Sequence, residues 1–163
     1  MDARPEYRRL DDPADTLTDI DRLHPFVSGL VVVASVDLEQ QVMLAAAPLP
    51  EEPSGGWDLH AAGCALTDVA LALLPSRPPG RRRRGALITV VCRRAPSSRS
   101  AVDEWWAEAW IHADPCIDAA VGQVFAVTPS GWHGVGDRRA GVEPRLRPRL
   151  SLVHIDAVPH SGA

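Results

Sequence analysis

The order of apolar and polar residues along the chain predicts strands that alternate with helices. Residues 29–36 are β-branched and nearly all apolar, which is typical of a strand buried on both faces of a sheet. After a polar turn, residues 41–46 are expected to return as a second strand. Residues 85–92 and 121–128 predict two further buried strands, and residues 150–158 predict a last strand at the sheet edge.

Helical spacing of apolar residues marks the segments between these strands. Residues 57–74 place leucine, alanine and valine side chains on one face, and Pro75 ends the pattern. Residues 101–113 have a wide apolar face, with Ser100 as the expected N-cap. A turn at residues 129–132 follows the fourth strand, and the chain beyond it is expected to pair back on that strand.

The two ends of the chain differ in composition from its middle. Residues 1–25 are acidic and include a short amphipathic helix, for which Thr16 and Asp19 are the expected capping pair. Residues 137–163 are rich in proline and arginine. Both segments are expected to pack loosely on a core domain formed by residues 26–136.

These elements together predict a single α/β domain. Strands that alternate with helices favour some parallel pairing, while the early hairpin makes the sheet mixed. The expected architecture is a mixed β-sheet of roughly four to six strands with two main helices, in two or three layers. A length of 163 residues and a hydrophobic content of 45% are sufficient for one domain with its own core.

Composition argues against several classes of protein. No apolar run approaches the ~20 residues that cross a bilayer, and the first residues contain no apolar signal core, so we expect a cytoplasmic protein. Cys64, Cys92 and Cys116 are too far apart for a zinc knuckle, and their odd number does not favour a disulfide framework. All 17 basic residues are arginine, a bias typical of a GC-rich genome, and we expect an actinobacterial source.

Catalytic and cofactor motifs do not stand out in the sequence. Without lysine there is neither a Schiff-base nor a P-loop lysine, and no G-x-S-x-G motif is present. His112, Asp114 and Cys116 form a local group of metal-ligand types but lack the spacing of a zinc site. Glu51 and Glu52 fall in a predicted loop, where sequence alone cannot place them for paired-carboxylate chemistry. We therefore predict no catalytic residues, no metal and no cofactor.

The strongest charge feature is a basic stretch, residues 77–100, with eight arginines and no acidic residue. The rest of the chain has nine arginines and 21 acidic residues, and the net charge is −4, unlike a typical nucleic-acid-binding domain. The stretch is interpreted first as a solvated or internally paired loop. It is interpreted next as a site for nucleic acid or another polyanion, or for an acidic protein. The residues of such a surface would be Arg81, Arg82, Arg83, Arg84, Arg93 and Arg94.

The tryptophans of the second main helix have a structural and a functional interpretation. Trp105, Trp106 and Trp110 have helical spacing, which favours packing in the core. Two adjacent residues on a helix cannot both point straight inward, so Trp105 is predicted to lie at a rim or an interface. Tryptophan rings also stack on the bases of single-stranded nucleic acids.

The order of elements in residues 30–135 carries a resemblance to a known family. The strand, loop and helix start are ALITVVCRRAPSSRSAVDEWW, and the final strand and turn are FAVTPSGWHGV. This region resembles, in the order of its elements, the JAB (MPN) domain of RadC-type proteins. In that family a His-x-His-Pro loop and a downstream Asp bind zinc, which activates water. Residues 92–98 contain no histidine, and no acid follows before Asp103. The resemblance therefore implies a metal-less domain without hydrolase activity.

The function expected from the sequence is that of a non-catalytic interaction or accessory domain, for which the resemblance suggests a metal-less JAB-like domain. In this hypothesis the arginines engage an acidic partner protein and Trp105 anchors it. A nucleic-acid-binding module that uses the same arginines is one alternative, and a metal-dependent hydrolase is another. No membrane association is expected, and the sequence does not identify the partner or the oligomeric state.

Overall fold

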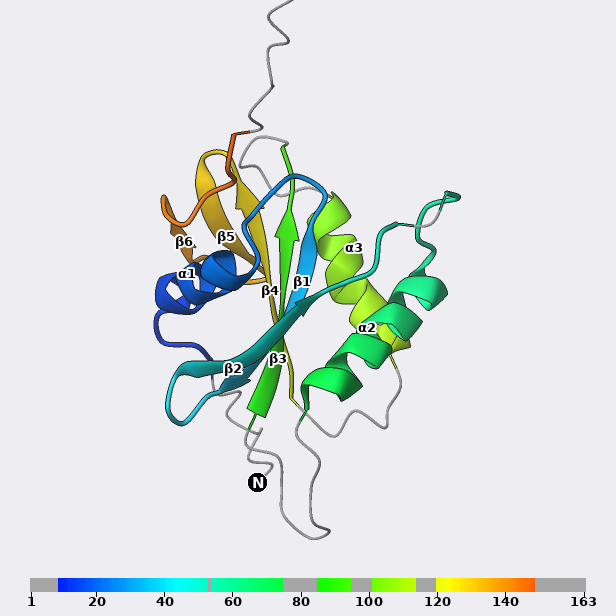
Figure 1. Cartoon of the computed structure of the whole chain (residues 1–163), viewed down its shortest axis with the longest axis horizontal. Coiled ribbons are helices and arrows are strands. Elements are labelled where there is room, and N and C mark those ends of the chain that lie inside the picture. Colours follow the sequence, from blue (N-terminus) through cyan, green and yellow to red (C-terminus); the bar gives the residue numbers. More distant parts are fainter. Residues whose placement is uncertain (1–8, 53, 75–84, 95–100, 114–119, 149–163) are drawn as a thin grey trace, which may run out of the picture.

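A computed structural model describes residues 9–52, 54–74, 85–94, 101–113 and 120–148. A six-stranded sheet runs through the molecule in the order β2-β1-β3-β4-β5-β6 (Figure 1). Its strands are β1 (Val31–Asp37), β2 (Val42–Pro48), β3 (Gly85–Cys92), β4 (Ala120–Thr128), β5 (Gly131–Val135) and β6 (Ala140–Gly141). The helices are α1 (Pro13–Leu23), α2 (Leu59–Leu73), α3 (Ala101–Ala109) and the short 3-10 helix η1 (Trp110–His112).

Strand direction explains where the helices lie. Strands β2 and β3 both run antiparallel to β1, so they share one direction, and β4 is parallel to β3. The crossovers β2–α2–β3 and β3–α3–β4 therefore advance across the sheet in the same sense. Because such crossovers are right-handed, both helices are placed on the same face of the sheet. Helix α1 covers the opposite face, which gives three layers (Figure 1).

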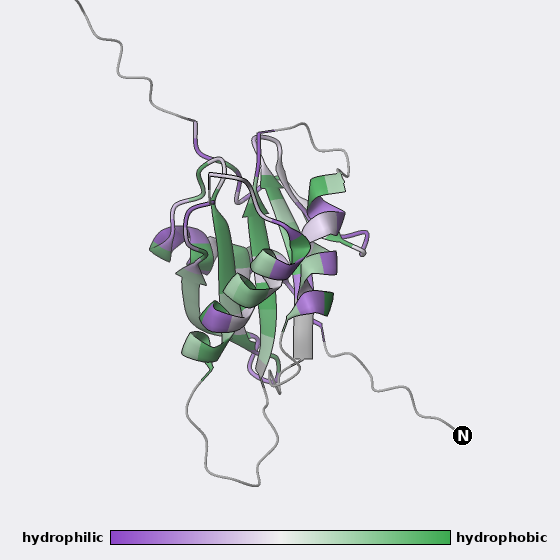
Figure 2. Ribbon diagram, turned by 90° about the vertical axis from the view of Figure 1, so that its right-hand side faces the viewer, coloured by the Kyte–Doolittle hydropathy of each residue, from purple (hydrophilic) through white to green (hydrophobic). Residues whose placement is uncertain are grey.

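Each face of the sheet has its own hydrophobic core. On one face, Val32 and Val36 of β1 pack in the cluster that contains Ile20 of α1. On the other face, Val33 of β1 packs in the cluster that contains Leu66 of α2 and residues of α3. The central strands are consequently apolar on both sides (Figure 2), which agrees with their uninterrupted apolar sequences.

The predicted fold class, an α/β domain with a mixed sheet, is confirmed. Of the two layer arrangements left open by the sequence, the three-layer one is present because α1 forms a layer of its own. Helix α3 is shorter than the helix predicted over residues 101–113, since the chain tightens into η1 at Trp110. The strand predicted over residues 150–158 lies outside the described residues. Within the described ranges, no helix has the length and apolar character needed to cross a membrane.

The N-terminus of α1 differs from the prediction. Its N-cap is Asp12, whose carboxylate accepts a hydrogen bond of 3.0 Å from the backbone N–H of Ala14. Pro13 occupies the first helical position, where a missing N–H costs nothing and the fixed φ angle suits the helix. Thr16, the predicted cap, is instead buried within the helix. The sequence-based prediction was wrong because it overlooked this aspartate–proline start.

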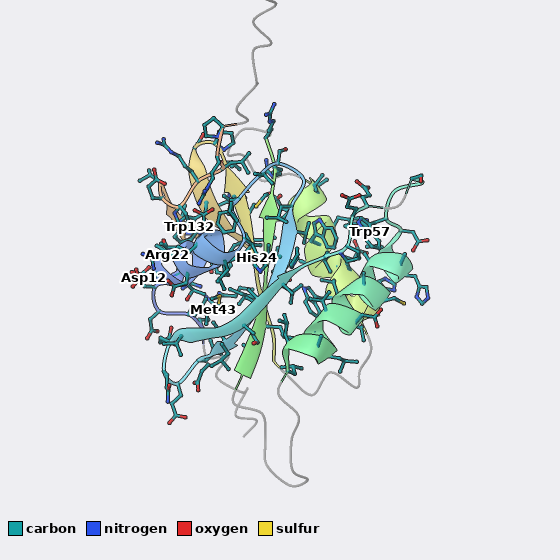
Figure 3. All side chains as sticks on the ribbon, viewed as in Figure 1. Asp12, Arg22, His24, Met43, Trp57 and Trp132 are labelled. Carbon is teal, nitrogen blue, oxygen red and sulfur yellow. The ribbon has the colours of Figure 1, made fainter. Side chains whose placement is uncertain are left out.

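The described parts of the two end segments are packed into the core, and the prediction of loose packing is wrong for them. Leu17 and Ile20 of α1 have no exposed surface, and Leu146 is buried in the same cluster. The imidazole Nε2 of His24, at the end of α1, lies 3.1 Å from the carbonyl oxygen of Ala46 in β2 (Figure 3). These contacts make α1 and the chain around Leu146 parts of the sheet's own core.

Candidate functional site

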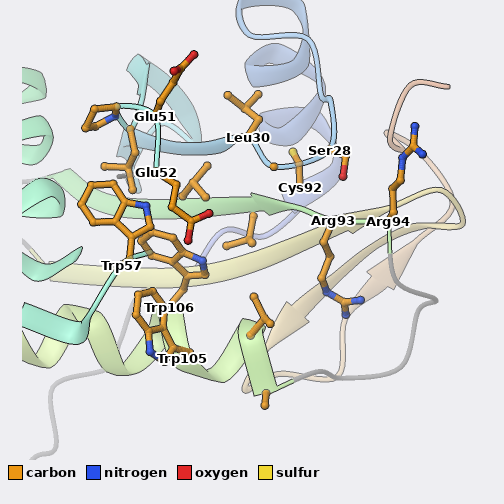
Figure 4. Close-up of a pocket in the computed structure, with 17 residues that line it drawn as sticks. Ser28, Leu30, Glu51, Glu52, Trp57, Cys92, Arg93, Arg94, Trp105 and Trp106 are labelled. Carbon is orange, nitrogen blue, oxygen red and sulfur yellow. The ribbon is translucent and has the colours of Figure 1, made fainter. Parts of the chain in front are cut away.

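A cleft of about 650 Å³ opens at the carboxyl end of β3 (Figure 4). Because β2 and β3 run in the same direction, the chain that leaves β2 and the chain that leaves β3 meet at this end of the sheet. The walls of the cleft are residues 49–52 after β2, residues 28–31 at the start of β1, and the first turns of α3. In open α/β sheets, ligands commonly bind at the carboxyl ends of strands.

Backbone hydrogen bonds fix the floor of this cleft. The N–H of Gly29 donates to the carbonyl of Cys92 at 2.9 Å, and the N–H of Cys92 donates to the carbonyl of Leu30 at 2.9 Å. The N–H of Leu49 donates to the carbonyl of Val31 at 2.8 Å. Gly29 has a φ of +89°, a left-handed conformation that favours glycine. The floor is therefore a hydrogen-bonded continuation of the sheet.

Three of the five tryptophans line the cleft. Trp57 precedes α2, and Trp105 and Trp106 are neighbours on α3, with ring centroids 5.0 Å apart and ring planes at 90°. Trp106 turns into the core and is 5% exposed, while Trp105 stays partly exposed. Trp132 lies on the α1 side of the sheet, away from Trp57 (Figure 3). The role of Trp105 as an interface anchor stays a prediction.

A buried ion pair joins the end of β3 to the first turn of α3. Nε and Nη2 of Arg93 donate hydrogen bonds of 2.7 Å each to Oδ1 and Oδ2 of Asp103, which is 1% exposed. The imidazole Nε2 of His133 in β5 lies 3.2 Å from Oδ2 of the same carboxylate. A carboxylate at this position also interacts favourably with the positive end of the helix dipole. The network therefore fixes the start of α3, and with it one wall of the cleft.

The predicted arginine surface is placed only in part. Arg93 is 9% exposed and engaged with Asp103, and its part in a partner surface stays a prediction. Arg94 is exposed and lines the rim of the cleft. The other four predicted residues, 81–84, lie outside the described part of the chain. Side chains alternate in direction along an extended backbone, which explains why two adjacent arginines differ so strongly in burial.

Two carboxylates stand on the loop that follows β2. Glu51 and Glu52 are exposed and line the cleft. Figure 4 shows the carboxylate of Glu52 directed into the cleft, toward the indole of Trp106. No arginine or histidine of the described residues forms an ion pair with either glutamate. Their negative charge is therefore available to a ligand.

Cys92 borders the cleft, but its thiol packs in the hydrophobic cluster on the α1 face of the sheet and is not activated. Burial, and then the negative charge of Asp21, raise its pKa from an ordinary value of 9.0 to about 12. The sulfur is consequently a neutral thiol at physiological pH, and a neutral thiol is a poor nucleophile and a poor metal ligand.

Metal ligands do not gather in the described part of the chain. No group of three or more histidine, cysteine, aspartate or glutamate side chains there is arranged to hold an ion. His60 and Cys64 approach within 3.8 Å on the exposed face of α2, but they are only two. Of the local group noted in the sequence, His112 is exposed at the end of η1, while residues 114 and 116 lie outside the described ranges. So do residues 95–98 of the segment compared with the JAB metal loop.

The sequence did not indicate Trp57 as part of a site, and it noted Glu51 and Glu52 without placing them beside the tryptophans. A tryptophan directly after the polar segment PSGG was a usable signal, because a large aromatic residue in a loop needs a packing partner. Comparison of the chain with models of protein families, with curated proteins and with solved structures found no match.

Proposed function

We propose that the chain is a non-catalytic binding domain and that its ligand site is the tryptophan-lined cleft at the carboxyl end of β3. The observation that carries this proposal is the combination of size and lining. A volume of about 650 Å³ falls within the range of small-molecule sites, roughly 300–1,000 Å³. The walls combine aromatic and aliphatic side chains with a few charged groups, which is the usual composition of such sites.

Two polar residues at the cleft, Cys92 and Asp103, are not in a state that suits catalysis. A nucleophile or a general base needs a lone pair that is free to react. Cys92 is held as a neutral thiol, and Asp103 is engaged by Arg93 and His133. The Asp103 network holds the start of α3, and the proposal assigns recognition to the indoles and the two glutamates.

Docking of an acidic partner or of nucleic acid on the arginines takes second place in this proposal. Of the six arginines that would carry it, Arg93 is neutralised by Asp103. Arg94 extends away from the indoles (Figure 4), so an anion bound to it would not also contact the tryptophans. A metal-less JAB-like origin for the domain is compatible with a non-catalytic role and remains a proposal.

A screen of small fragments by ligand-observed NMR tests the proposed site. Val102 lies half-exposed at the mouth of the cleft, in the first turn of α3, so Val102→Trp should obstruct it. Leu71→Trp is the matched control, because Leu71 is similarly exposed on α2 and does not line the cleft. We expect fragments that bind the native chain and the control but not Val102→Trp. Fragments that bind all three chains equally would place the site elsewhere and overturn the proposal.

A further inference from the structure

The negative charge of the cleft is concentrated beside its aromatic wall. Glu51 and Glu52 follow β2 by only a few residues, and Trp57 stands on the same connection to α2. The carboxylate of Glu52 and the indoles of Trp57 and Trp106 face a common space in Figure 4. A ligand in this space contacts aromatic rings and carboxylate oxygens together.

Positive charge is not available to the same space from the described residues. The guanidinium of Arg93 makes two hydrogen bonds of 2.7 Å with Asp103, which cancels its charge. The side chain of Arg94 is directed away from the tryptophans (Figure 4). Among the described residues, an anionic ligand beside the indoles would therefore meet the repulsion of two glutamates, and the exposed Arg94 at the rim points away from it.

We infer that the cleft binds a small organic cation of the alkylammonium class, an inference that rests on the proposed function. The face of an indole ring attracts cations through its quadrupole, and most strongly where water is partly excluded. The glutamates add Coulombic attraction. The apolar walls suit a cation whose charge is surrounded by carbon, because its methyl or methylene groups pack against the rings while the charge faces the carboxylates.

Metal cations match this environment poorly. Ca²⁺ takes about six to eight oxygen ligands and Mg²⁺ keeps an octahedral shell of about six, largely water. Tryptophan rings supply no such oxygens, and the described residues contain no cluster of three or more metal-ligand side chains. The aromatic wall therefore discriminates in favour of an organic cation.

The inference is tested by isothermal titration calorimetry with two probes of the same shape, choline and its neutral carbon analogue 3,3-dimethylbutan-1-ol. Replacing the charged nitrogen by carbon removes the attraction to indoles and carboxylates but keeps the apolar volume. We expect choline to bind the native chain about tenfold more tightly than the alcohol. Raised salt should weaken the binding of choline and leave that of the alcohol unchanged.

Variants locate the interaction within the cleft. The double variant Glu51→Gln, Glu52→Gln should weaken choline about three- to fivefold and leave the alcohol unaffected. The matched control is Glu104→Gln, Glu108→Gln, which removes two exposed carboxylates of α3 that do not line the cleft. The control should bind choline as the native chain does. Trp105→Leu keeps an apolar side chain and should weaken choline more than the alcohol.

The outcomes separate this inference from the proposed function. If both probes bind equally, or if only the alcohol binds, the cleft is a binding site but not one for cations, and the inference fails alone. If neither probe binds, but small fragments bind the native chain and do not bind Val102→Trp, the inference again fails alone. If choline binds but both glutamine double variants weaken it equally, the attraction is a general surface effect and the inference is overturned.

Discussion

The indole Nε1 of Trp110 donates a hydrogen bond of 2.8 Å to the hydroxyl oxygen of Thr89, and both side chains are buried between the sheet and the helices. Thr89 lies in the middle of β3 and Trp110 at the start of η1, so the bond ties the end of the α3 segment to the central strand. It satisfies a polar group that tryptophan brings into the core.

Thr89→Val should reveal the value of this bond. Valine has nearly the shape of threonine but offers no acceptor, so the buried N–H loses its partner at a cost of about 1–3 kcal/mol. Chemical denaturation followed by circular dichroism measures the change. The double variant Thr89→Val, Trp110→Phe should lose less stability than the sum of the two single changes. Strict additivity would mean that the two side chains are not coupled.

The ion pair between Arg93 and Asp103 should be far more sensitive to the loss of one partner than of both. Asp103→Asn leaves a buried guanidinium without its counter-charge, and we expect a loss of about 3–5 kcal/mol in the free energy of unfolding. Arg93→Leu combined with Asp103→Leu should be less damaging than Asp103→Asn. The exposed pair Arg22–Asp19 is the control, and Asp19→Asn should cost less than about 1 kcal/mol. Equal losses at both sites would contradict the assigned burial.

Cys92 should give the stability a characteristic dependence on alkaline pH. Its pKa is 9.0 in its ordinary state and about 12 in the folded chain. Between these values the unfolded chain has released the thiol proton and the folded chain has kept it, so the free energy of unfolding falls as pH rises. Well below pH 9 the Cys92 thiol is protonated in both the folded and the unfolded chain, so its contribution to the free energy of unfolding does not change with pH.

Urea denaturation at several alkaline pH values measures this slope. Cys92→Ala removes the titrating group and should show a shallower decline than the native chain, whatever its absolute stability. Cys64→Ala is the control, because Cys64 is exposed, and it should keep the native slope. A native slope in Cys92→Ala would assign the alkaline decline to other groups.

Gly63 should resist substitution even by alanine, the best helix former. A Cβ at this position of α2 would lie 2.8 Å from the backbone carbonyl carbon and oxygen of His112. The resulting displacement of η1 costs about 1–3 kcal/mol, which exceeds the roughly 1 kcal/mol that alanine contributes to an exposed helix. Gly55→Ala meets nothing within 4 Å and should be nearly neutral. Thermal unfolding of the two variants compares them directly, and a stabilised Gly63→Ala would disprove the close approach.

The strands could be read from the sequence because apolar runs buried on both faces are long and uninterrupted. Residues 85–92 illustrate this: the predicted strand and β3 have the same bounds. The start of α1 was misplaced because Asp12 and Thr16 are both good caps, and only the packing of Thr16 into the core decides between them. Local preference alone does not make that choice.

The cleft was harder to foresee because it depends on contacts between distant segments. Trp57 and Trp105 line the same cleft only because β2 and β3 run in the same direction, which the sequence did not establish. Arg93 and Arg94 are chemically identical in the sequence. Which of them turns inward depends on strand geometry and on Asp103, ten positions further along the chain. Charge composition therefore indicated that both arginines belong to a basic surface, whereas Arg93 forms a buried ion pair and only Arg94 is exposed.

The connection between β2 and α2 has a consequence for how such a domain evolves. Glu51 and Glu52 shape one wall of the cleft and belong to neither hydrophobic core, whereas Leu49 and Trp57 of the same connection pack in the core beneath α2 and α3. Substitutions among the exposed glutamates of this connection leave the buried apolar surface unchanged. Selection can therefore alter what the cleft accepts without first compensating for lost stability, so new specificities are accessible by single steps on an unchanged framework.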